Sequence, residues 1–144
     1  MESRLSPGDE IPNGEFLFRY CSPMVFPEGQ EDIPISIFND LELSCDWEYY
    51  MKNPSSSFHI SEGLSVVIKI SVCQEIKDIE NPKRSGQIVK DWHQDIIYSP
   101  IAENADEKHG ANEAHSLIKG RKKAPVTQAL SNHSILFLRC DKQG

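Results

Sequence analysis

The sequence predicts a small α+β domain with a mixed or mostly antiparallel sheet, long loops and one C-terminal helix. Short segments rich in β-branched and aromatic residues recur along the chain, as in EFLFRY and LSVVIKISV. Loops rich in proline, glycine and charged residues separate them, and a single segment near the C-terminus has helical spacing. A chain of 144 residues fits one domain, which buries roughly 68% of the surface that its unfolded chain exposes. One core therefore suffices without disulfides or metal.

Strands are expected wherever apolar residues alternate or cluster over a short length. The segments are residues 15–20, 35–40, 41–47, 64–72, 95–100, 112–120 and 135–140. The run at 64–72 carries the strongest signal and predicts a central strand. Residues 35–47 predict a bent strand or a tight hairpin. Residues 112–120 fit a strand better than a helix, because a helix capped by Asn112 and closed by Gly120 would have fewer than two and a half turns.

The helix is expected to begin at Pro125, a residue suited to a first helical position, with an apolar stripe that includes Val126 and Leu130. Residues 1–14 place prolines and glycines among charges, which is typical of a flexible N-terminal arm. Residues 15–144 then form the single α+β domain. The polar segment 101–112 is expected to be a mobile loop.

Charge is divided unevenly along the chain, whose net charge is −7. Residues 1–107 hold 8 Lys or Arg against 20 Asp or Glu, whereas residues 108–144 hold 7 against 2. An acidic body repels phosphate backbones, so nucleic acid could bind only through the basic C-terminal quarter. The candidate phosphate contacts there are Lys119, Arg121, Lys122 and Lys123. The alternative for these residues is a solvated loop before the helix.

The chain is expected to be cytoplasmic and not to associate with a membrane. Its first fourteen residues lack the apolar stretch of a signal peptide, and Lys69 interrupts the longest apolar run. Its four cysteines form no CxxC pair, which favours reduced, mostly buried thiols over a disulfide framework. No metal site is expected, because the available histidines and cysteines lack zinc-ligand spacing, and no cofactor motif is present.

Arg19, His93 and His115 are the candidate catalytic residues. A pair of histidines can take and give a proton, and an arginine can stabilise developing negative charge. Each of the three lies at or beside a predicted strand, so they could open onto one edge of the sheet. The alternative is structural, with His93 solvated and His115 fixing a turn with Asn112.

Ser36, Ser44 and Asp46 are candidate ligand-binding residues on the early hairpin, together with Asn112. Serine and aspartate are also ordinary residues near turns, so this assignment competes with a purely local role. Asn112 is expected to set the turn, with His115 projecting from the following strand toward the end of the strand that carries Arg19.

The segments LFRY, ISIFND, LELSCDW, WHQDIIYSP and NEAHSLIKG, in this order, resemble those of a diffuse group of small uncharacterised bacterial proteins with a closing N-P-A-H-A-x-I-x-G motif. The resemblance covers roughly residues 16–137, and Glu113 and Ser116 depart from the motif. It implies matched positions at Arg19, Asn112, His115 and Gly120 but no chemistry. LFRY and the isolated histidines also resemble features of small transferases of the ADP-ribosyl and RNA 2′-phosphotransferase type. Those folds open on a strand that ends in a basic residue and use histidines around a bound dinucleotide.

Two functions follow as expectations. The first is a non-catalytic accessory or interaction protein of the bacterial cytoplasm, one component of a multi-gene system, with a protein partner. Missing catalytic motifs, long polar loops and divided charge favour it. The alternative is a small ribonuclease or nucleotide-dependent transferase that uses Arg19, His93 and His115.

Overall fold

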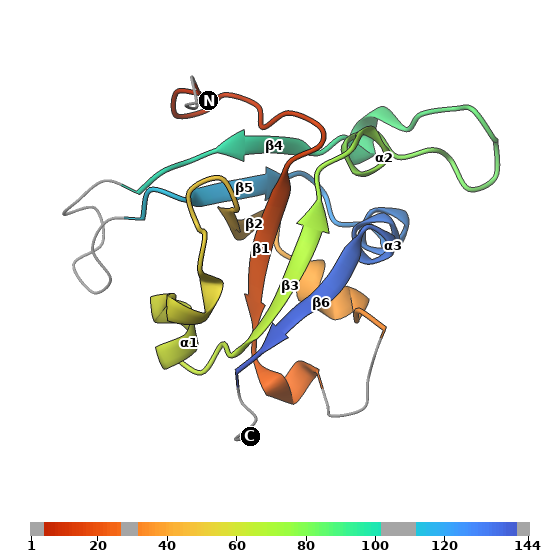
Figure 1. The fold of residues 1–144 in the computed structure, drawn as a ribbon. Coiled ribbons are helices and arrows are strands. Elements are labelled where there is room, and N and C mark those ends of the chain that lie inside the picture. The colour runs from red at the N-terminus through yellow and green to blue at the C-terminus, as the bar shows by residue number, and fades with distance from the viewer. Residues whose placement is uncertain (1–4, 27–31, 102–111, 141–144) are drawn as a thin grey trace.

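The computed structural model describes residues 5–26, 32–101 and 112–140, and a six-stranded sheet is the centre of this part of the chain (Figure 1). The strands are β1 Phe16–Cys21, β2 Glu42–Trp47, β3 Val66–Ser71, β4 Asp95–Tyr98, β5 His115–Lys119 and β6 Ser134–Arg139. Their order is β4-β5-β2-β1-β3-β6, and every neighbouring pair is antiparallel. The predicted α+β class with an antiparallel sheet is confirmed.

The helices of the described chain are short apart from one. They are α1 Phe58–Ser61, α2 Gln74–Lys77 and α3 Ala124–Asn132, with 3-10 turns η1 Pro23–Val25, η2 Ile35–Phe38, η3 Pro54–Ser56 and η4 Lys90–Trp92. The helix predicted from Pro125 is confirmed as α3. Within the described ranges, no helix has the length and apolar character needed to cross a membrane.

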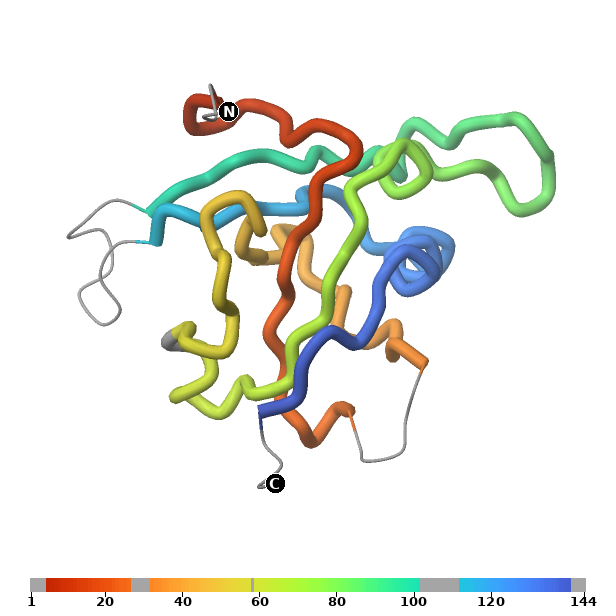
Figure 2. Tube along the Cα trace, in the orientation of Figure 1, coloured from red at the N-terminus to blue at the C-terminus, as the bar shows by residue number. Residues whose placement is uncertain are grey.

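The sheet is strongly twisted, and its two halves separate along one seam. In Figures 1 and 2, β1, β3 and β6 lie closer to the vertical of the view, with β3 antiparallel to the other two, whereas β4 and β5 run across it. β1 is in register with β3 along its whole length, yet it pairs with β2 only at Leu17↔Trp47 and Phe18↔Asp46. β1 and β2 therefore diverge after Phe18, and this divergence positions the candidate site.

Each face of the sheet has its own apolar cluster. The larger cluster joins the strands to η2, α2 and α3, and its fully buried members include Leu43, Ile68 and Leu130. The smaller cluster centres on Phe18, Tyr20 and Val67, with partly buried residues from the α1 region packed against it. The alternation of β1 thus sends apolar side chains to both faces, as expected for an interior strand.

One predicted strand is wrong. Residues 35–38 form the 3-10 turn η2, not a strand, although the next segment is the predicted β2. Adjacent residues Ile37 and Phe38 are both buried, while Ile35 and Ser36 are exposed. A strand would send these neighbouring side chains to opposite faces, whereas η2 lies beside α3 and buries both of them in the larger cluster.

The expected N-terminal arm contacts the sheet in its described part. The backbone amides of Gly8 and Ile11 donate to the carbonyls of Tyr98 and Ile96 in β4, at 2.7 and 2.8 Å, and the Ile11 side chain is fully buried. The buried ammonium of Lys77 binds Glu10 at 2.9 Å. Residues 8–11 therefore lie against the edge of β4. The expected mobile loop at 101–112 lies outside the described residues except at its ends.

The four cysteines are free thiols, in line with the sequence prediction. Burial raises the pKa of Cys45 to about 12 and that of Cys21 to about 11. Both thiols are therefore protonated at neutral pH and behave as small apolar side chains.

Candidate functional site

A cavity of about 300 Å³ lies where β1 and β2 diverge. Strands β1, β2 and β5, the α1 region and the chain beside Ile101 and Asn112 form its wall. Its lining residues are Arg19, Tyr20, Ser44, Cys45, Asp46, His59, Glu62, Leu64, Ile101, Asn112 and His115. Five of the sequence-predicted residues therefore meet at one place: Arg19, Ser44, Asp46, Asn112 and His115.

Arg19 holds the diverging strands together. Its Nη1 donates to the backbone carbonyl of Ser44 in β2 at 2.9 Å, where β1 no longer supplies a backbone partner. Its Nη2 forms an ion pair with Asp40 at 3.3 Å. Two of the three guanidinium nitrogens are thus engaged by the protein, one of them by the Asp40 carboxylate.

Asp46 and Asn112 form the buried floor of the cavity. Asp46 is 1% exposed, and its Oδ1 accepts a hydrogen bond from Asn112 Nδ2 at 3.0 Å. Asn112 Oδ1 accepts from the backbone amide of Ala114 at 3.1 Å, so the same side chain fixes the turn that precedes β5. The expected turn role of Asn112 is visible in its bond with Ala114, and its bond with Asp46 adds a second role.

His115 lies at the rim with one ring nitrogen committed to the fold. Its Nδ1 is 2.8 Å from the carbonyl oxygen of Ser99, which can only accept, so Nδ1 carries the proton in this contact. In the tautomer with its proton on Nδ1, Nε2 is an acceptor, and it lies 3.4 Å from Ser44 Oγ. The rim therefore presents a serine hydroxyl beside an imidazole nitrogen of the tautomer that can accept a proton.

Tyr20 and His59 close the α1 side of the cavity. Their rings stack with centroids 4.4 Å apart and planes inclined by 27°. Burial, followed by the charge of Asp46, raises the pKa of Tyr20 well above its ordinary value. Tyr20 therefore stays a neutral phenol that can both donate and accept. Sequence reasoning missed both residues, because Tyr20 lies within an apolar strand and His59 within a serine-rich segment expected to be a solvated loop.

Three polar atoms of the lining residues are buried without a partner in good hydrogen-bond geometry, and the Tyr20 hydroxyl lies close enough to the Asp46 and Ser57 side chains for hydrogen bonds with both to influence its pKa. They are Arg19 Nε, Tyr20 Oη and Asp46 Oδ2, and in the described part of the chain only Gln94 Oε1 shares this property. Buried polar atoms in native proteins nearly always have partners, and each unpaired one costs about 1–3 kcal/mol. Their concentration around one cavity distinguishes this place from the rest of the described chain.

His93 does not join the cavity. It lies between Asp78 and Asp95, with Nδ1 at 2.7 Å from one carboxylate and Nε2 at 3.0 Å from the other. Asp95 is paired with Lys119 at the far end of β5 from His115, roughly 13 Å along the strand. The predicted catalytic pair of histidines is therefore not brought together.

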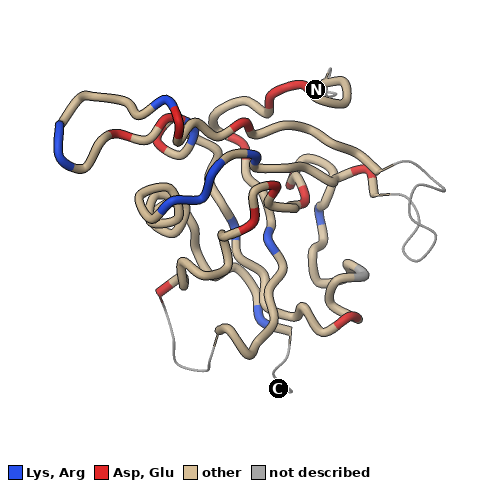
Figure 3. Tube along the Cα trace, turned by 180° about the vertical axis from the view of Figure 1, so that it is seen from behind, with Lys and Arg blue, Asp and Glu red and all other residues tan. Residues whose placement is uncertain are grey.

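Ser36 and the basic residues lie elsewhere. Ser36 is exposed on η2 and does not line the cavity. Arg121, Lys122 and Lys123 line a second hollow of about 280 Å³ with Asn39 and Leu41, in the basic segment that leads into α3 (Figure 3). Lys119 lies in β5 with Glu42 and Asp95 as its cross-strand partners.

Lys122 is a structural residue. Its Nζ donates to the carbonyls of Leu41, Ile118 and Gly120, at 3.2, 3.0 and 2.8 Å. An ammonium has three hydrogens, so none is left for a phosphate. Burial lowers the pKa of Lys122 to about 8, which further weakens it as a phosphate contact. Of the four predicted basic contacts, Arg121 and Lys123 are exposed.

No group of three or more His, Cys, Asp or Glu side chains within the described ranges is arranged to hold a metal ion. Comparison with protein-family models, with curated protein sequences and with solved structures finds no match to this chain.

Proposed function

We propose that the chain is a non-catalytic binding protein that holds a small polar ligand in the cavity between β1 and β2. The observation that carries this proposal is the cavity itself, where Arg19, Asp46 and His115 converge although they come from three different strands. A concave site with a few convergent polar groups is where small ligands bind in proteins.

The wider role expected from the sequence stays part of the proposal: an accessory or interaction protein of the bacterial cytoplasm, one component of a multi-gene system, with a protein partner. The separation of His93 from His115 supports binding over catalysis, because the expected acid and base do not face one substrate.

A thermal-shift screen of small polar compounds tests the binding proposal. Ser44 is exposed at the rim, so Ser44→Trp should fill the mouth of the cavity without removing a buried group. Ser36→Trp is the matched control, since it places the same side chain on exposed η2 away from the cavity. Compounds that bind in the cavity should raise the melting temperature of the parent and of Ser36→Trp but not of Ser44→Trp. Equal shifts in all three proteins would place binding elsewhere and reject the proposal.

A second candidate function is a small transferase or hydrolase, and the 3.4 Å contact between His115 Nε2 and Ser44 Oγ favours it. In this candidate Ser44 takes the place of His93 in the expected set of Arg19, His93 and His115. Ser44 would be the nucleophile, His115 the base and Arg19 the source of positive charge, for an ester or a nucleotide substrate. The contact is longer than an ordinary O–H···N hydrogen bond, which is why this candidate ranks second.

Acetylation by p-nitrophenyl acetate tests the second candidate. Ser44 Oγ would attack the ester carbonyl, its proton would pass to His115 Nε2, and nitrophenolate would leave. Peptide mass spectrometry should then find an acetyl group on Ser44 in the parent and not in His115→Ala. A parent protein without acetylated Ser44 would remove the catalytic candidate and leave the binding proposal in place.

A further inference from the structure

We infer that the second hollow, just before α3, binds the phosphate group of a small phosphate monoester through Arg121 and Lys123. This hollow has a volume of about 280 Å³, and its lining residues are Asn39, Leu41, Arg121, Lys122 and Lys123. It shares no lining residue with the β1–β2 cavity, so the inference concerns a separate site and does not depend on the proposed function.

The wall of the hollow is positively charged. Three of its five lining residues are cations, and none is a carboxylate. Among the described residues, neither the Arg121 guanidinium nor the Lys123 ammonium has a hydrogen-bond or ion-pair partner, and both residues are exposed. A phosphate that enters the hollow therefore meets two uncommitted cations, and the hydrogen bonds between such groups are stronger than those between neutral ones.

Lys122 adds charge to the hollow rather than a hydrogen bond. Its ammonium donates to three backbone carbonyls, which bind it without neutralising its charge. Lys123, the next residue, is the N-cap of α3, and the first turn of this helix contains no acidic residue. Negative charge is the kind that stabilises the start of a helix, so three consecutive cations are unfavourable there. A bound phosphate would relieve this repulsion.

The turn that carries the two uncommitted cations is anchored in the fold. The Gly120 amide donates to the Leu41 carbonyl at 2.9 Å, and Gln94 Nε2 donates to the Arg121 carbonyl, also at 2.9 Å. Gln94 is fully buried, so the second bond ties the backbone of the turn to the interior. The backbone that carries the cations is therefore fixed before a ligand binds, which lowers the entropic cost of binding.

The size and the neighbours of the hollow favour a small monoester over nucleic acid. The hollow is larger than a phosphate group, which leaves room for adjoining carbon atoms beside the exposed side chain of Leu41. The side-chain amide of Asn39 can donate to or accept from a hydroxyl of the same compound. Asp40 and Glu42 are exposed on either side of Leu41, and they would repel the successive phosphates of a nucleic-acid backbone.

NMR titration of the full chain with glycerol 3-phosphate at constant ionic strength tests the inference. The amide signals of residues 121–124 should shift saturably, and glycerol, which lacks the phosphate, should not shift them. Arg121→Gln and Lys123→Gln should each weaken the binding of glycerol 3-phosphate by about fivefold. Arg84→Gln and Lys83→Gln are the matched controls, because they remove the same charges from exposed positions that do not line the hollow. Neither control should change the affinity.

Four other outcomes would overturn the inference. Equal weakening by Arg84→Gln and Arg121→Gln would show that overall charge alone attracts the phosphate. Inorganic phosphate that binds as tightly as glycerol 3-phosphate would make free phosphate the ligand. If a single-stranded oligonucleotide shifts residues 121–124 and glycerol 3-phosphate does not, the surface binds nucleic acid.

The remaining outcome concerns the other site. Ser44→Trp should bind glycerol 3-phosphate as the parent does, and loss of binding in this variant would place the ester in the β1–β2 cavity. For this reason, the compounds screened against that cavity contain no phosphate.

Discussion

Asn112 Nδ2 donates a 3.0 Å hydrogen bond to Asp46 Oδ1, so one amide side chain connects the turn before β5 to the buried carboxylate of β2. These residues are far apart in the chain, and their contact lies at the floor of the cavity. The bond supplies Asp46 Oδ1 with a donor, and the Tyr20 hydroxyl is a second hydrogen-bonding group beside this carboxylate. The same contact therefore stabilises the fold and shapes the candidate site.

Asn112→Ala should destabilise the protein by about 1–3 kcal/mol, because it removes a donor from the buried Asp46 carboxylate and leaves the Ala114 amide without its side-chain acceptor. Urea unfolding followed by circular dichroism measures the change. Asn13→Ala is the control at an exposed position and should change stability by less than about 0.5 kcal/mol. Equal effects of the two substitutions would show that the Asn112 contacts contribute little.

His93→Gln should destabilise the protein in acid more than in alkali. The hydrogen bond with Asp78, followed by that with Asp95, raises the pKa of His93 above its ordinary value of 6.5. A raised histidine pKa means that the contribution to stability is complete below pH 6.5 and is lost as pH rises through the folded-state pKa. Because His93 is exposed, the loss at low pH should be about 0.5–1 kcal/mol. Melting temperatures of both proteins at pH 5.5 and pH 9 measure it, and a difference independent of pH would contradict the ion-pair role.

Lys122→Ala should cost about 1–3 kcal/mol, since three carbonyl oxygens lose a shared donor. Lys123→Ala removes the same charge from the adjacent exposed position and should cost less than about 0.5 kcal/mol. Denaturant midpoints of the two variants give the comparison. If both variants unfold at the denaturant midpoint of the parent, the three hydrogen bonds of Lys122 do not stabilise the fold. Lys122 would then again be a candidate phosphate contact.

Gly120→Ala should be more damaging than Gly63→Ala. Both glycines have positive φ, of +149° and +92°, so both substitutions strain the backbone. At Gly120 the new Cβ would also lie 2.5 Å from the His93 carbonyl oxygen and 2.6 Å from Gln94 Nε2, whereas at Gly63 it meets open space. We expect the Gly120 variant to lose at least about 2 kcal/mol more stability by chemical denaturation. Similar losses would indicate that the chain near His93 moves aside.

The strands and α3 could be predicted because each carries a local signal. The β-branched run at 64–72 and the proline at the start of α3 need no tertiary information. η2 could not be predicted, since Ile37 and Phe38 take their conformation from the core that they fill. The helices α1 and α2 are single turns whose polar residues resemble those of a loop.

Part of the site could be predicted for a related reason. Arg19, Ser44, Asp46, Asn112 and His115 are polar residues in or beside apolar strands, which is a local anomaly that sequence reasoning detects. The position of His93 depends on the register of β4 with β5, and that of His59 on how α1 folds over Tyr20. Neither arrangement has a sequence signal. The same is true of Lys122, whose three carbonyl partners come from separate parts of a turn.

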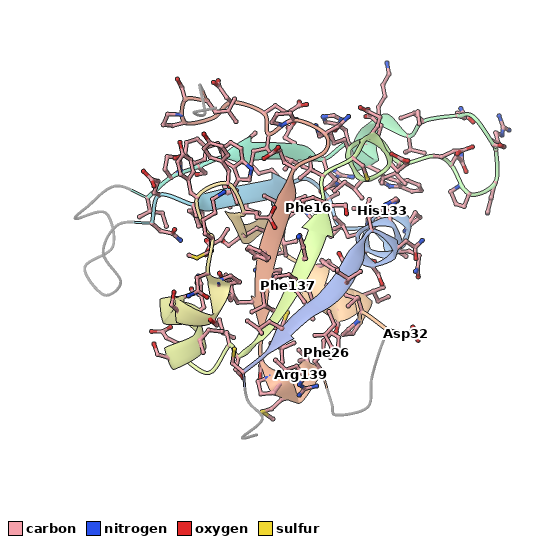
Figure 4. The ribbon with its side chains drawn as sticks, in the orientation of Figure 1. Phe16, Phe26, Asp32, His133, Phe137 and Arg139 are labelled. Carbon is pink, nitrogen blue, oxygen red and sulfur yellow. The ribbon has the colours of Figure 1, made fainter. Side chains whose placement is uncertain are left out.

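An aromatic surface formed by Phe16 of β1 and Phe137 of β6 lies apart from the cavity. Figure 4 places Phe16 and Phe137 on neighbouring parts of the sheet, where Lys69 Nζ lies 4.4 Å from one ring centroid and 5.2 Å from the other. Phe137 remains 43% exposed. The surface places the Lys69 ammonium over two aromatic rings, and none of these three residues lines the cavity.

Amide chemical-shift mapping by NMR is the most direct test of cavity binding, using any compound that raises the melting temperature in the screen. Shifts should concentrate at residues 19–20, 44–46 and 112–115 in the parent and in Ser36→Trp, and should vanish in Ser44→Trp. Shifts centred instead on the basic segment 119–123, or unchanged by Ser44→Trp, would contradict the assignment of the β1–β2 cavity as the binding site.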